Sequence, residues 1–292
     1  MTNSDTTYVT IFTPAYNRAY ILPCLYASLC RQSCLDFEWL IVDDGSNDDT
    51  ESIVQALIAE NRIRIRYIRQ NNGGKHRAIN KGLSEASGKL FMIVDSDDYL
   101  TDDAIEWMCR EGKKIEDIAD LCGLSGIRIT PSGAKIGGGS VFEKINASAI
   151  DIRLKHGIKG DLAEIFKTDI LKKYPFPEFE GEKFCPEALV WFRMARKYKM
   201  SFFHKGIYIC EYLPDGLTAK ITRIRRESPR ASMTFYAEHF HDAIPLKWKI
   251  KAAINFWRFA LAPYQRSYDM LSPLSLLCFI PGKLMSLRDS IS

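Results

Sequence analysis

The sequence lacks paired cysteines and long apolar runs, and each absence excludes a class of protein. Its eight cysteines are scattered with no CxxC pair, which excludes a zinc framework or a disulfide scaffold and fits a reducing cytosol. No uninterrupted apolar run reaches the ~20 residues that a membrane-spanning helix needs. The start of the chain shows no basic stretch followed by an apolar core, so we expect no signal peptide. These absences favour a cytoplasmic protein.

The charge of the chain is small in total and uneven in distribution. The 292 residues are 46% hydrophobic and 26% charged, as in an ordinary globular protein, and the formal net charge is +4. Between Lys220 and Arg258 stand nine bases and three acids, so the rest of the chain is slightly acidic. This basic segment predicts an anionic partner, which is a membrane surface, a phosphate-bearing substrate or a nucleic acid. We expect a main domain over 1–220 and a basic helical region over 221–292.

Strands and helices alternate through the first third of the chain. Apolar runs predict strands at 8–13, where Pro14 ends the run, and at 37–42, 63–68 and 90–94, with helices between them. This spacing indicates parallel strands joined by right-handed crossovers, an α/β fold whose polar loops share one edge of the sheet. The layout is typical of nucleotide-binding proteins, yet neither GxxxxGK[ST] nor GxGxxG is present. A nucleotide would therefore be held by carboxylates and a metal.

An acidic segment, Asp95-Ser96-Asp97-Asp98, follows the apolar run at 90–94 directly. Three carboxylates within four positions repel one another unless a cation joins them, and oxygen ligands suit Mg²⁺ or Mn²⁺. The alternative is an acidic turn that precedes a helix near Asp102. Because the acidic segment follows a strand that we expect to be buried, it is a candidate ligand site.

Three segments, taken in order, resemble the signature of family 2 glycosyltransferases. They are TPAYNR at 13–18, VDDGS at 42–46 and the DXD-containing DSDD at 95–98. Each is weak alone, but their order and spacing together are specific over the first third of the chain, and we extend the resemblance to about residue 220. It implies a GT-A fold, a mostly parallel twisted sheet flanked by helices. It also implies inverting sugar transfer from a nucleotide-sugar, with donor binding in 1–100 and the acceptor and catalytic base in 101–220.

The resemblance assigns roles to individual residues of the donor site. Tyr16 would border the base, and Asp44, with Asp43 beside it, would accept a hydrogen bond from uracil, which makes UDP the favoured nucleotide. Asp95 would approach the ribose. The expected nucleotide-sugar-binding residues are Pro14, Tyr16, Arg18, Asp43, Asp44, Lys75, Arg77, Asp95, Ser96 and Asp97. For the three bases, Arg18, Lys75 and Arg77, the alternative is an ordinary solvated basic face.

The resemblance also implies a divalent metal, Mn²⁺ or Mg²⁺, on the diphosphate. Asp97 would ligate it, with Asp95 or Asp98 as further candidates, because a cation must neutralise the leaving diphosphate. Many family members carry a metal-binding His near residue 212, but this sequence has none between His204 and His239. Other polar residues there, Glu211, Asp215 and Thr218, are either contacts to substrate or an ordinary turn.

A candidate base lies at the start of a later predicted helix. Inverting transfer needs a base that takes the proton of the acceptor hydroxyl. In the family this is an Asp or Glu at a helix start with an Arg six positions on, and Glu187 and Arg193 reproduce that spacing. Pro186 replaces the first member of the usual acidic pair, which leaves Glu182 as a second candidate. The alternative for Glu187 is a carboxylate that only complements the helix dipole.

The basic C-terminal region predicts an amphipathic helix from residue 246. Its apolar face holds Ile250, Ala253, Ile254, Trp257, Leu261 and Tyr264, and its other face holds Lys247, Lys251, Asn255 and Arg258. A following apolar segment, 271–285, is broken by Pro273 and Pro281 and is too short to span a bilayer. These helices either contact an anionic membrane peripherally, at the cytoplasmic face of the inner membrane, or pack on the catalytic domain or a second subunit.

These features together predict a metal-dependent inverting glycosyltransferase. Its acceptor would be a glycan or a lipid-linked oligosaccharide in bacterial surface polysaccharide synthesis, such as capsule, O-antigen or exopolysaccharide. The alternatives are a nucleotidyltransferase, which would show a glycine-rich basic loop after the first strand, and a non-catalytic sugar-nucleotide-binding protein. The joint presence of Asp44, Asp97 and Glu187 argues against the latter. No nucleic-acid partner is expected, because no matching motif accompanies the bases.

Overall fold

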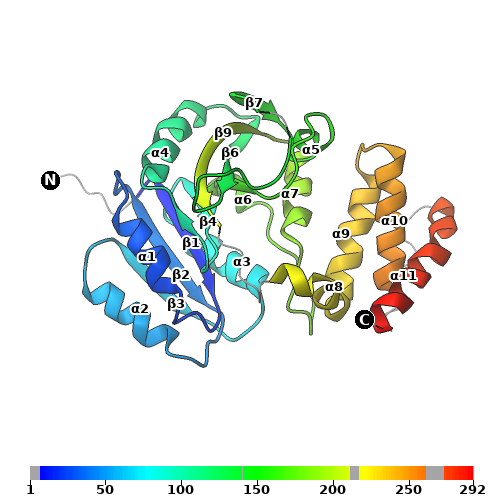
Figure 1. Cartoon of the computed structure of the whole chain (residues 1–292), viewed down its shortest axis with the longest axis horizontal. Helices are drawn as coiled ribbons and strands as arrows, with labels where there is room; N and C mark the ends of the chain where they lie inside the picture. Colours follow the sequence, from blue (N-terminus) through cyan, green and yellow to red (C-terminus); the bar gives the residue numbers. More distant parts are fainter. Residues whose placement is uncertain (1–6, 140, 211–216, 261–272, 292) are drawn as a thin grey trace. The chain divides into compact units, whose positions relative to one another are not determined.

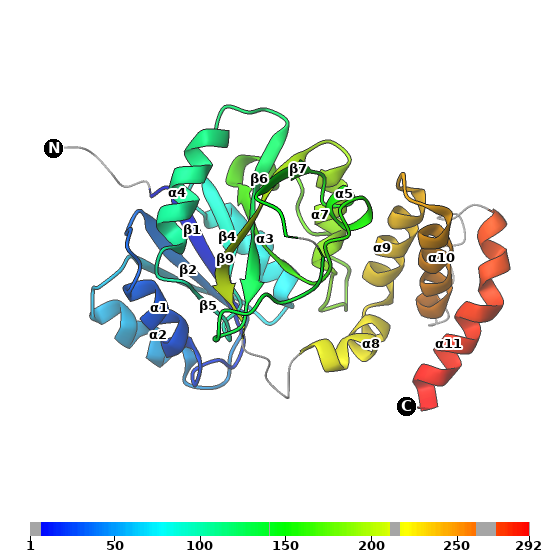
Figure 2. The same ribbon diagram turned by 45° about the horizontal axis from the view of Figure 1, so that its top comes forward.

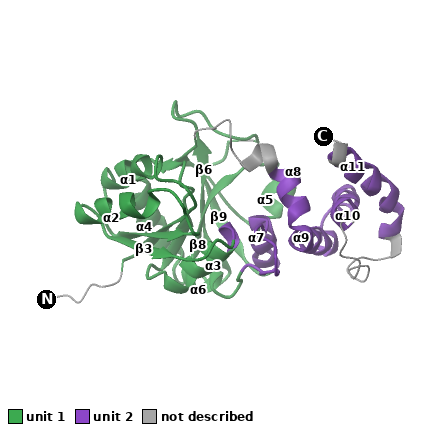
Figure 3. Ribbon diagram, turned by 90° about the horizontal axis from the view of Figure 1, so that it is seen from below, with its two compact units in different colours: residues 1–73, 77–175, 197–211 green, residues 74–76, 176–196, 212–292 purple. Residues whose placement is uncertain are grey.

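The computed structural model describes residues 7–139, 141–210, 217–260 and 273–291. The chain divides into two compact units, which Figure 3 colours separately. Unit 1 comprises 1–73, 77–175 and 197–211, and unit 2 comprises 74–76, 176–196 and 212–292. The expected domain boundary at residue 220 stays a prediction. It marks how far the sequence resembles the glycosyltransferase family, whereas the two units are defined by the packing of the chain.

Across the described residues, unit 1 is built on a nine-stranded sheet (Figure 1). The strand order is β3-β2-β1-β4-β8-β6-β9-β5, and β7 pairs with β9. The strands are β1 (Val9–Ala15), β2 (Phe37–Asp43), β3 (Ile65–Arg69), β4 (Leu90–Ile93), β5 (Tyr99–Leu100), β6 (Leu121–Ile129), β7 (Lys144–Ala147), β8 (Leu162–Lys167) and β9 (Lys199–Ile209). The first four strands are parallel, so their carboxyl ends share one edge.

Helices cover both faces of this sheet, which explains the continuous apolar runs of its central strands. Figure 3 shows three helices on one face, α1 (Leu22–Cys30), α2 (Thr50–Ala59) and α4 (Ala104–Ile115). On the other face lie α3 (Lys75–Glu85) and α6 (Thr168–Leu171), while α5 (Asp151–Leu154) follows β7. The helices of the first face share one apolar core with alternate residues of the strands, such as Ile11, Trp39 and Met92.

The first strand runs past Pro14, although the sequence predicted that Pro14 would end it. Its ladder with β4 stops at the pair Phe12–Ile93, and the last bond to that side runs from Val94 N to Phe12 O. The backbone N–H of residue 14 would point to the same side as the backbone groups of Phe12, towards β4. Because β4 has already ended there, no ladder bond needs the N–H that proline lacks. On the other side, Pro14 still pairs with Val42 of β2.

Unit 2 is helical across its described residues. It contains α7 (Glu187–Ala195), α8 (Leu217–Glu227), α9 (Pro229–His241), α10 (Leu246–Ala260), the 3₁₀ helix η2 (Pro273–Cys278) and α11 (Phe279–Ile291). Phe256, Trp257 and Phe259 of α10 pack in one cluster with Met233 and Ala237 of α9. Within the described part of the chain, no helix combines the length and apolar character needed to cross a membrane.

The faces of α10 differ in part from those that the sequence predicted. Ala253 and Trp257 are buried as expected, but Ile250 is exposed. Arg258, expected on the basic face, is mostly covered and pairs with Asp289 of α11 at 2.8 Å. Arg258 is covered because α11 packs on this side of α10. Leu261 and Tyr264 lie outside the described residues.

Candidate functional site

The loop after β2 is held by Asp43. This carboxylate is fully buried, and its Oδ1 accepts a hydrogen bond from Ser46 N at 2.8 Å while Oδ2 accepts one from the Tyr67 hydroxyl at 2.6 Å. Burial and this hydrogen bond raise the pKa of Tyr67. Gly45 takes the left-handed conformation of the turn with a φ of 80°. Asp43 thus shapes the loop from within.

Asp44, the next residue, joins this loop to the one after β3. Its Oδ1 accepts from Gly73 N at 2.9 Å and from Gln70 Nε2 at 2.7 Å, and its Oδ2 accepts from Asn72 Nδ2 at 3.2 Å. The carboxylate is nearly buried. Three donors therefore fix its orientation at the carboxyl edge of the sheet.

The loop after β1 is fastened to the same turn. Asn17 adopts a φ of 54°, its N–H donates to Ser46 Oγ at 2.8 Å, and its Oδ1 accepts from Asn47 N at 2.8 Å. Such a left-handed asparagine is sustained by local hydrogen bonds of this kind. Tyr16 projects with 45% of its surface exposed, and the Arg18 side chain donates to the Tyr20 hydroxyl at 3.0 Å. The half-buried Pro14 precedes them, near the end of β1.

The acidic loop after β4 rests on a buried tyrosine and a mostly covered arginine that the sequence did not point to. The Tyr208 hydroxyl accepts from Asp95 N at 2.9 Å and hydrogen-bonds the carboxyl of Asp98. Arg128 stacks on the Tyr208 ring at 4.4 Å and lies 3.9 Å from Asp98 Oδ2. Burial and the neighbouring Asp95 raise the pKa of Asp98 to about 6. No local signal could have revealed this, because β6 and β9 are distant in sequence.

The carboxylates of this loop suit a metal that arrives with its substrate. Among the described residues, no three His, Cys, Asp or Glu side chains form a group able to hold a metal ion. Mg²⁺ and Mn²⁺ are often bound through one or two carboxylates together with substrate phosphates, so such a group is not required. Asp95 and Asp97 are both partly exposed, whereas Ser96 and Asp98 are buried. The exposed pair fits this mode of binding.

In unit 2, Glu187 begins α7 and follows Pro186, which is the N-cap. Its Oε1 lies 2.7 Å from Lys75 Nζ, and each of these side chains is about one-third exposed. Arg193, six positions on, does not pair with Glu187. It forms a bidentate pair with Glu238 of α9, with Nη2–Oε1 at 2.6 Å.

The second candidate base, Glu182, has another role in the fold. Its Oε1 accepts from Arg230 N at 2.7 Å, and its Oε2 accepts from Ala231 N at 2.9 Å. These N–H groups lie in the first turn of α9, so Glu182 caps that helix and complements its dipole. The carboxylate is buried in this position.

The remaining residues predicted for the site are placed as follows. Arg77 donates from Nη1 to Gly73 O at 3.1 Å, in the loop that also binds Asp44. Glu211 and Asp215 lie outside the described residues, as does the side chain of Thr218.

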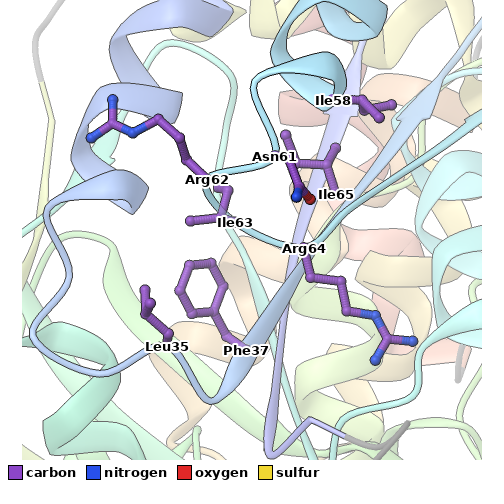
Figure 4. Close-up of a pocket in the computed structure, with 8 residues that line it drawn as sticks. All are labelled: Leu35, Phe37, Ile58, Asn61, Arg62, Ile63, Arg64 and Ile65. Atoms are coloured by element: carbon purple, nitrogen blue, oxygen red, sulfur yellow. The ribbon is translucent and has the colours of Figure 1, made fainter.

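An open pocket lies at the opposite ends of β2 and β3 (Figure 4). Apolar side chains such as Leu35, Phe37 and Ile63 line it, and Figure 4 shows Arg62 and Arg64 directed away from each other. Phe37 and Ile65 are the first residues of their strands. Ligands of open α/β sheets bind at the carboxyl ends of the strands, so the loops that carry Asp44 and Asp97 are the better candidate site.

Comparison with known proteins finds a family match for residues 10–124. Glycosyl transferase family 2 matches residues 10–124. A β-1,3-glucosyltransferase from Campylobacter jejuni, named for GalNAc(5)-diNAcBac-PP-undecaprenol, is 28% identical over 69% of this chain and 63% of its own length. Chondroitin synthase from Pasteurella multocida is 38% identical over 45% of this chain and 13% of its own length. The chain thus spans less than two thirds of either relative.

Solved structures show the same fold at low identity. S. aureus TarS 1-349 in complex with UDP-GlcNAc gives a TM-score of 0.61 at 18% identity, covering 94% of this chain and 79% of that one. Mannosyltransferase PcManGT from Pyrobaculum calidifontis, in complex with GDP-Man and Mn²⁺, gives 0.55 at 17%, covering 97% and 81%. The predicted GT-A fold is therefore confirmed. Residues 10–124 match glycosyl transferase family 2, as the three sequence segments indicated.

Proposed function

We propose that the chain transfers a sugar from a nucleotide-sugar, with UDP-sugars favoured, to a glycan or lipid-linked acceptor with inversion at the anomeric carbon. The observation that carries the proposal is the placement of carboxylates at one edge of the sheet. Asp44 follows β2 and Asp95 and Asp97 follow β4, and both strands run parallel to β1. The segments lie inside the family match.

The donor would bind across the loops after β1, β2 and β4. The exposed ring of Tyr16 is suited to border the base. Asp44, oriented by Gln70 and Gly73, would accept a hydrogen bond from uracil, sharing its carboxylate with those donors. Asp95 would approach the ribose. In this scheme Asp43 supports the donor-binding loop from within the fold, because its two oxygens accept hydrogen bonds from Ser46 N and the Tyr67 hydroxyl.

A divalent cation, Mn²⁺ or Mg²⁺, would supply neutralisation of the leaving diphosphate when bound. Asp97 is the proposed ligand, and Asp95 is the next candidate because both side chains are partly exposed. Asp98 is less suited, since its carboxyl lies buried against Tyr208 and Arg128. Arg128 and Tyr208 would hold the loop in the shape that presents Asp95 and Asp97.

Glu187 is the proposed base, and the contacts within unit 2 support it over Glu182. A base must be reachable by the acceptor hydroxyl, and Glu187 is one-third exposed at the start of α7. Glu182 is occupied with two N–H groups of α9. The Lys75 ammonium, 2.7 Å away, would orient the Glu187 carboxylate. Arg193 would act at a distance, by tying α7 to α9 through Glu238.

The relatives support an acceptor of bacterial surface polysaccharide synthesis. One is named for an undecaprenol-diphosphate-linked substrate and another for chondroitin. A lipid-linked acceptor would bring the working enzyme to the cytoplasmic face of the membrane as a peripheral protein. The basic C-terminal helices suit such contact.

The test of the donor site is a thermal-shift screen of the full chain with UDP-, GDP-, CMP- and dTDP-sugars. Each is measured with Mn²⁺ and with a chelator. A ligand at 100 times its dissociation constant adds about 2.7 kcal/mol to the stability of the folded state. We expect metal-dependent stabilisation by UDP-sugars. Equal melting temperatures with every donor would contradict the proposal.

A further inference from the structure

One face of α11 and the preceding turn is apolar and exposed. Leu277, Ile280, Leu284 and Leu287 are 80%, 69%, 63% and 54% exposed. They follow a 3-4-3 spacing, so they form one stripe along the helix. We call these four residues the α11 stripe. Four large apolar side chains in a continuous exposed row are unusual for a surface that only meets water.

The stripe is not the face by which α11 packs on unit 2. Gly282 faces α10 so closely that a Cβ there would lie 2.6 Å from Trp257 Cβ, and Asp289 pairs with Arg258 of α10. At 100° per residue, the stripe centres on the side opposite Gly282. Within unit 2, Figure 1 and Figure 2 show α10 beside α11, with no other described α-helix of that unit beyond α11.

The charges that flank the stripe are both positive. Lys283 and Arg288 are exposed, and on the helical wheel they lie on the two sides of the stripe. The acid of this helix, Asp289, is already paired with Arg258. A second copy of the chain on this face would bring like charges together, whereas an anionic lipid surface complements them.

We propose that α11 docks on an anionic lipid bilayer, lying in the plane of the interface. The α11 stripe would enter the acyl boundary, and Lys283 and Arg288 would reach the lipid phosphates. The 13 residues of the helix extend about 20 Å, which is too short to span but sufficient to lie flat. The inference rests on the lipid-linked acceptor of the proposed function, and it identifies the surface that would bring the enzyme to that acceptor.

The test is flotation of the full chain with vesicles of phosphatidylcholine alone or with about one third phosphatidylglycerol. We compare the wild type with the double variant Leu284→Ser, Leu287→Ser. The matched control is Leu35→Ser, Val141→Ser, which alters two apolar residues of unit 1 that are 61% and 79% exposed. We expect the partition coefficient on anionic vesicles to fall at least about tenfold in the stripe variant and to stay unchanged in the control.

The charges are tested in the same assay. Lys283→Gln and Arg288→Gln should each weaken binding about fivefold, which corresponds to about 1 kcal/mol per base, and high salt should have a similar effect on the wild type. Equal binding to neutral and anionic vesicles would overturn the charge argument. Circular dichroism and melting temperatures confirm that each variant is folded.

Three further outcomes would overturn the docking itself. The first is a stripe variant that binds vesicles as well as the wild type, and the second is a wild type that binds none. The third is a wild-type dimer in solution that the stripe variant converts to a monomer, which would assign the face to a second copy. Flotation uses neither donor nor acceptor, and donor-induced stabilisation is measured separately on each variant. A wild type that does not float but is still stabilised by the donor would reject the docking and leave the transferase proposal standing.

Discussion

At the scale of single residues, Glu187 and Glu182 show how surroundings decide between two similar side chains. They stand close together in the sequence, and pattern alone leaves both open as the base. Glu187 is partly exposed beside Lys75, whereas Glu182 is buried as the cap of α9. The distinction depends on residues 230 and 231, which are about fifty positions away in the chain, so it was not visible in the sequence.

Glutamine substitutions at these two positions should have opposite consequences. Glu187→Gln should lower kcat by about 10²–10⁴-fold with little change in donor KM, because only the proton acceptor is lost. Glu182→Gln should keep kcat near the wild-type value and lower the free energy of unfolding by about 1 kcal/mol, because the α9 cap is weakened. Steady-state kinetics and urea unfolding measure both. The reverse pattern would transfer the role of base to Glu182.

A buried carboxylate, Glu38, should make the stability of the protein depend on acid pH. Burial by itself would raise the pKa of Glu38, but hydrogen bonds from Ser87, Thr10 and Arg66 hold it below its usual value. A depressed pKa stabilises the folded state at pH values above the unfolded pKa. This contribution is lost as the pH falls through about 4.5 and below it.

The prediction is a steeper loss of stability below pH 4.5 in the wild type than in Glu38→Gln. Urea unfolding across pH 3 to 7 measures the slope, and Glu51→Gln is the control. Glu51 also pairs with an arginine, Arg69, but it is half exposed. Surface pairs of that kind contribute little, so the control should follow the wild type. Identical slopes for Glu38→Gln and the wild type would contradict the assignment.

At the scale of elements, the sequence predicted those strands best whose own residues form a continuous apolar run. The runs that became β1, β2 and β4 are buried on both faces, and this leaves a continuous apolar pattern. The signal of β9, which begins at Lys199, is weaker, because Lys205 and Gly206 interrupt its apolar run. β8 pairs antiparallel with β4, and only the assembled sheet specifies that partner.

The contact between α3 and β1 offers a test of this packing. A Cβ at Gly82 would lie 2.2 Å from the ring of Phe12, which itself stacks on Phe91 at 5.2 Å. Gly82→Ala should therefore destabilise the protein by about 1–3 kcal/mol through overpacking, although alanine favours helix by about 1 kcal/mol. Ser84→Ala, at an exposed position of the same helix, is the control and should be nearly neutral. Thermal unfolding of both variants gives the comparison.

At the scale of the whole molecule, the predicted functions divide between the two units. The carboxylates proposed for the donor, Asp44, Asp95 and Asp97, belong to unit 1, and the proposed base and the α11 stripe belong to unit 2. The sequence placed the donor residues in 1–100, the base in 101–220 and the basic helices in 221–292, and this assignment stays a prediction. The sequence could not show that Asp43 and Asp44 differ, since one supports the loop from within and the other ties two loops together.

This division predicts that donor binding can be removed without altering unit 2. Asp97→Asn should abolish the Mn²⁺-dependent increase in melting temperature with UDP-sugar, because a neutral amide would hold a divalent cation less well than a carboxylate. The control is Asp102→Asn, whose exposed side chain pairs with Arg31 at the surface and should behave as the wild type. Glu187→Gln should keep the full donor-induced increase in melting temperature, because this substitution removes only the proton acceptor. An unchanged shift in Asp97→Asn would move the metal to Asp95, whereas a lost shift in Glu187→Gln would make that residue a donor contact.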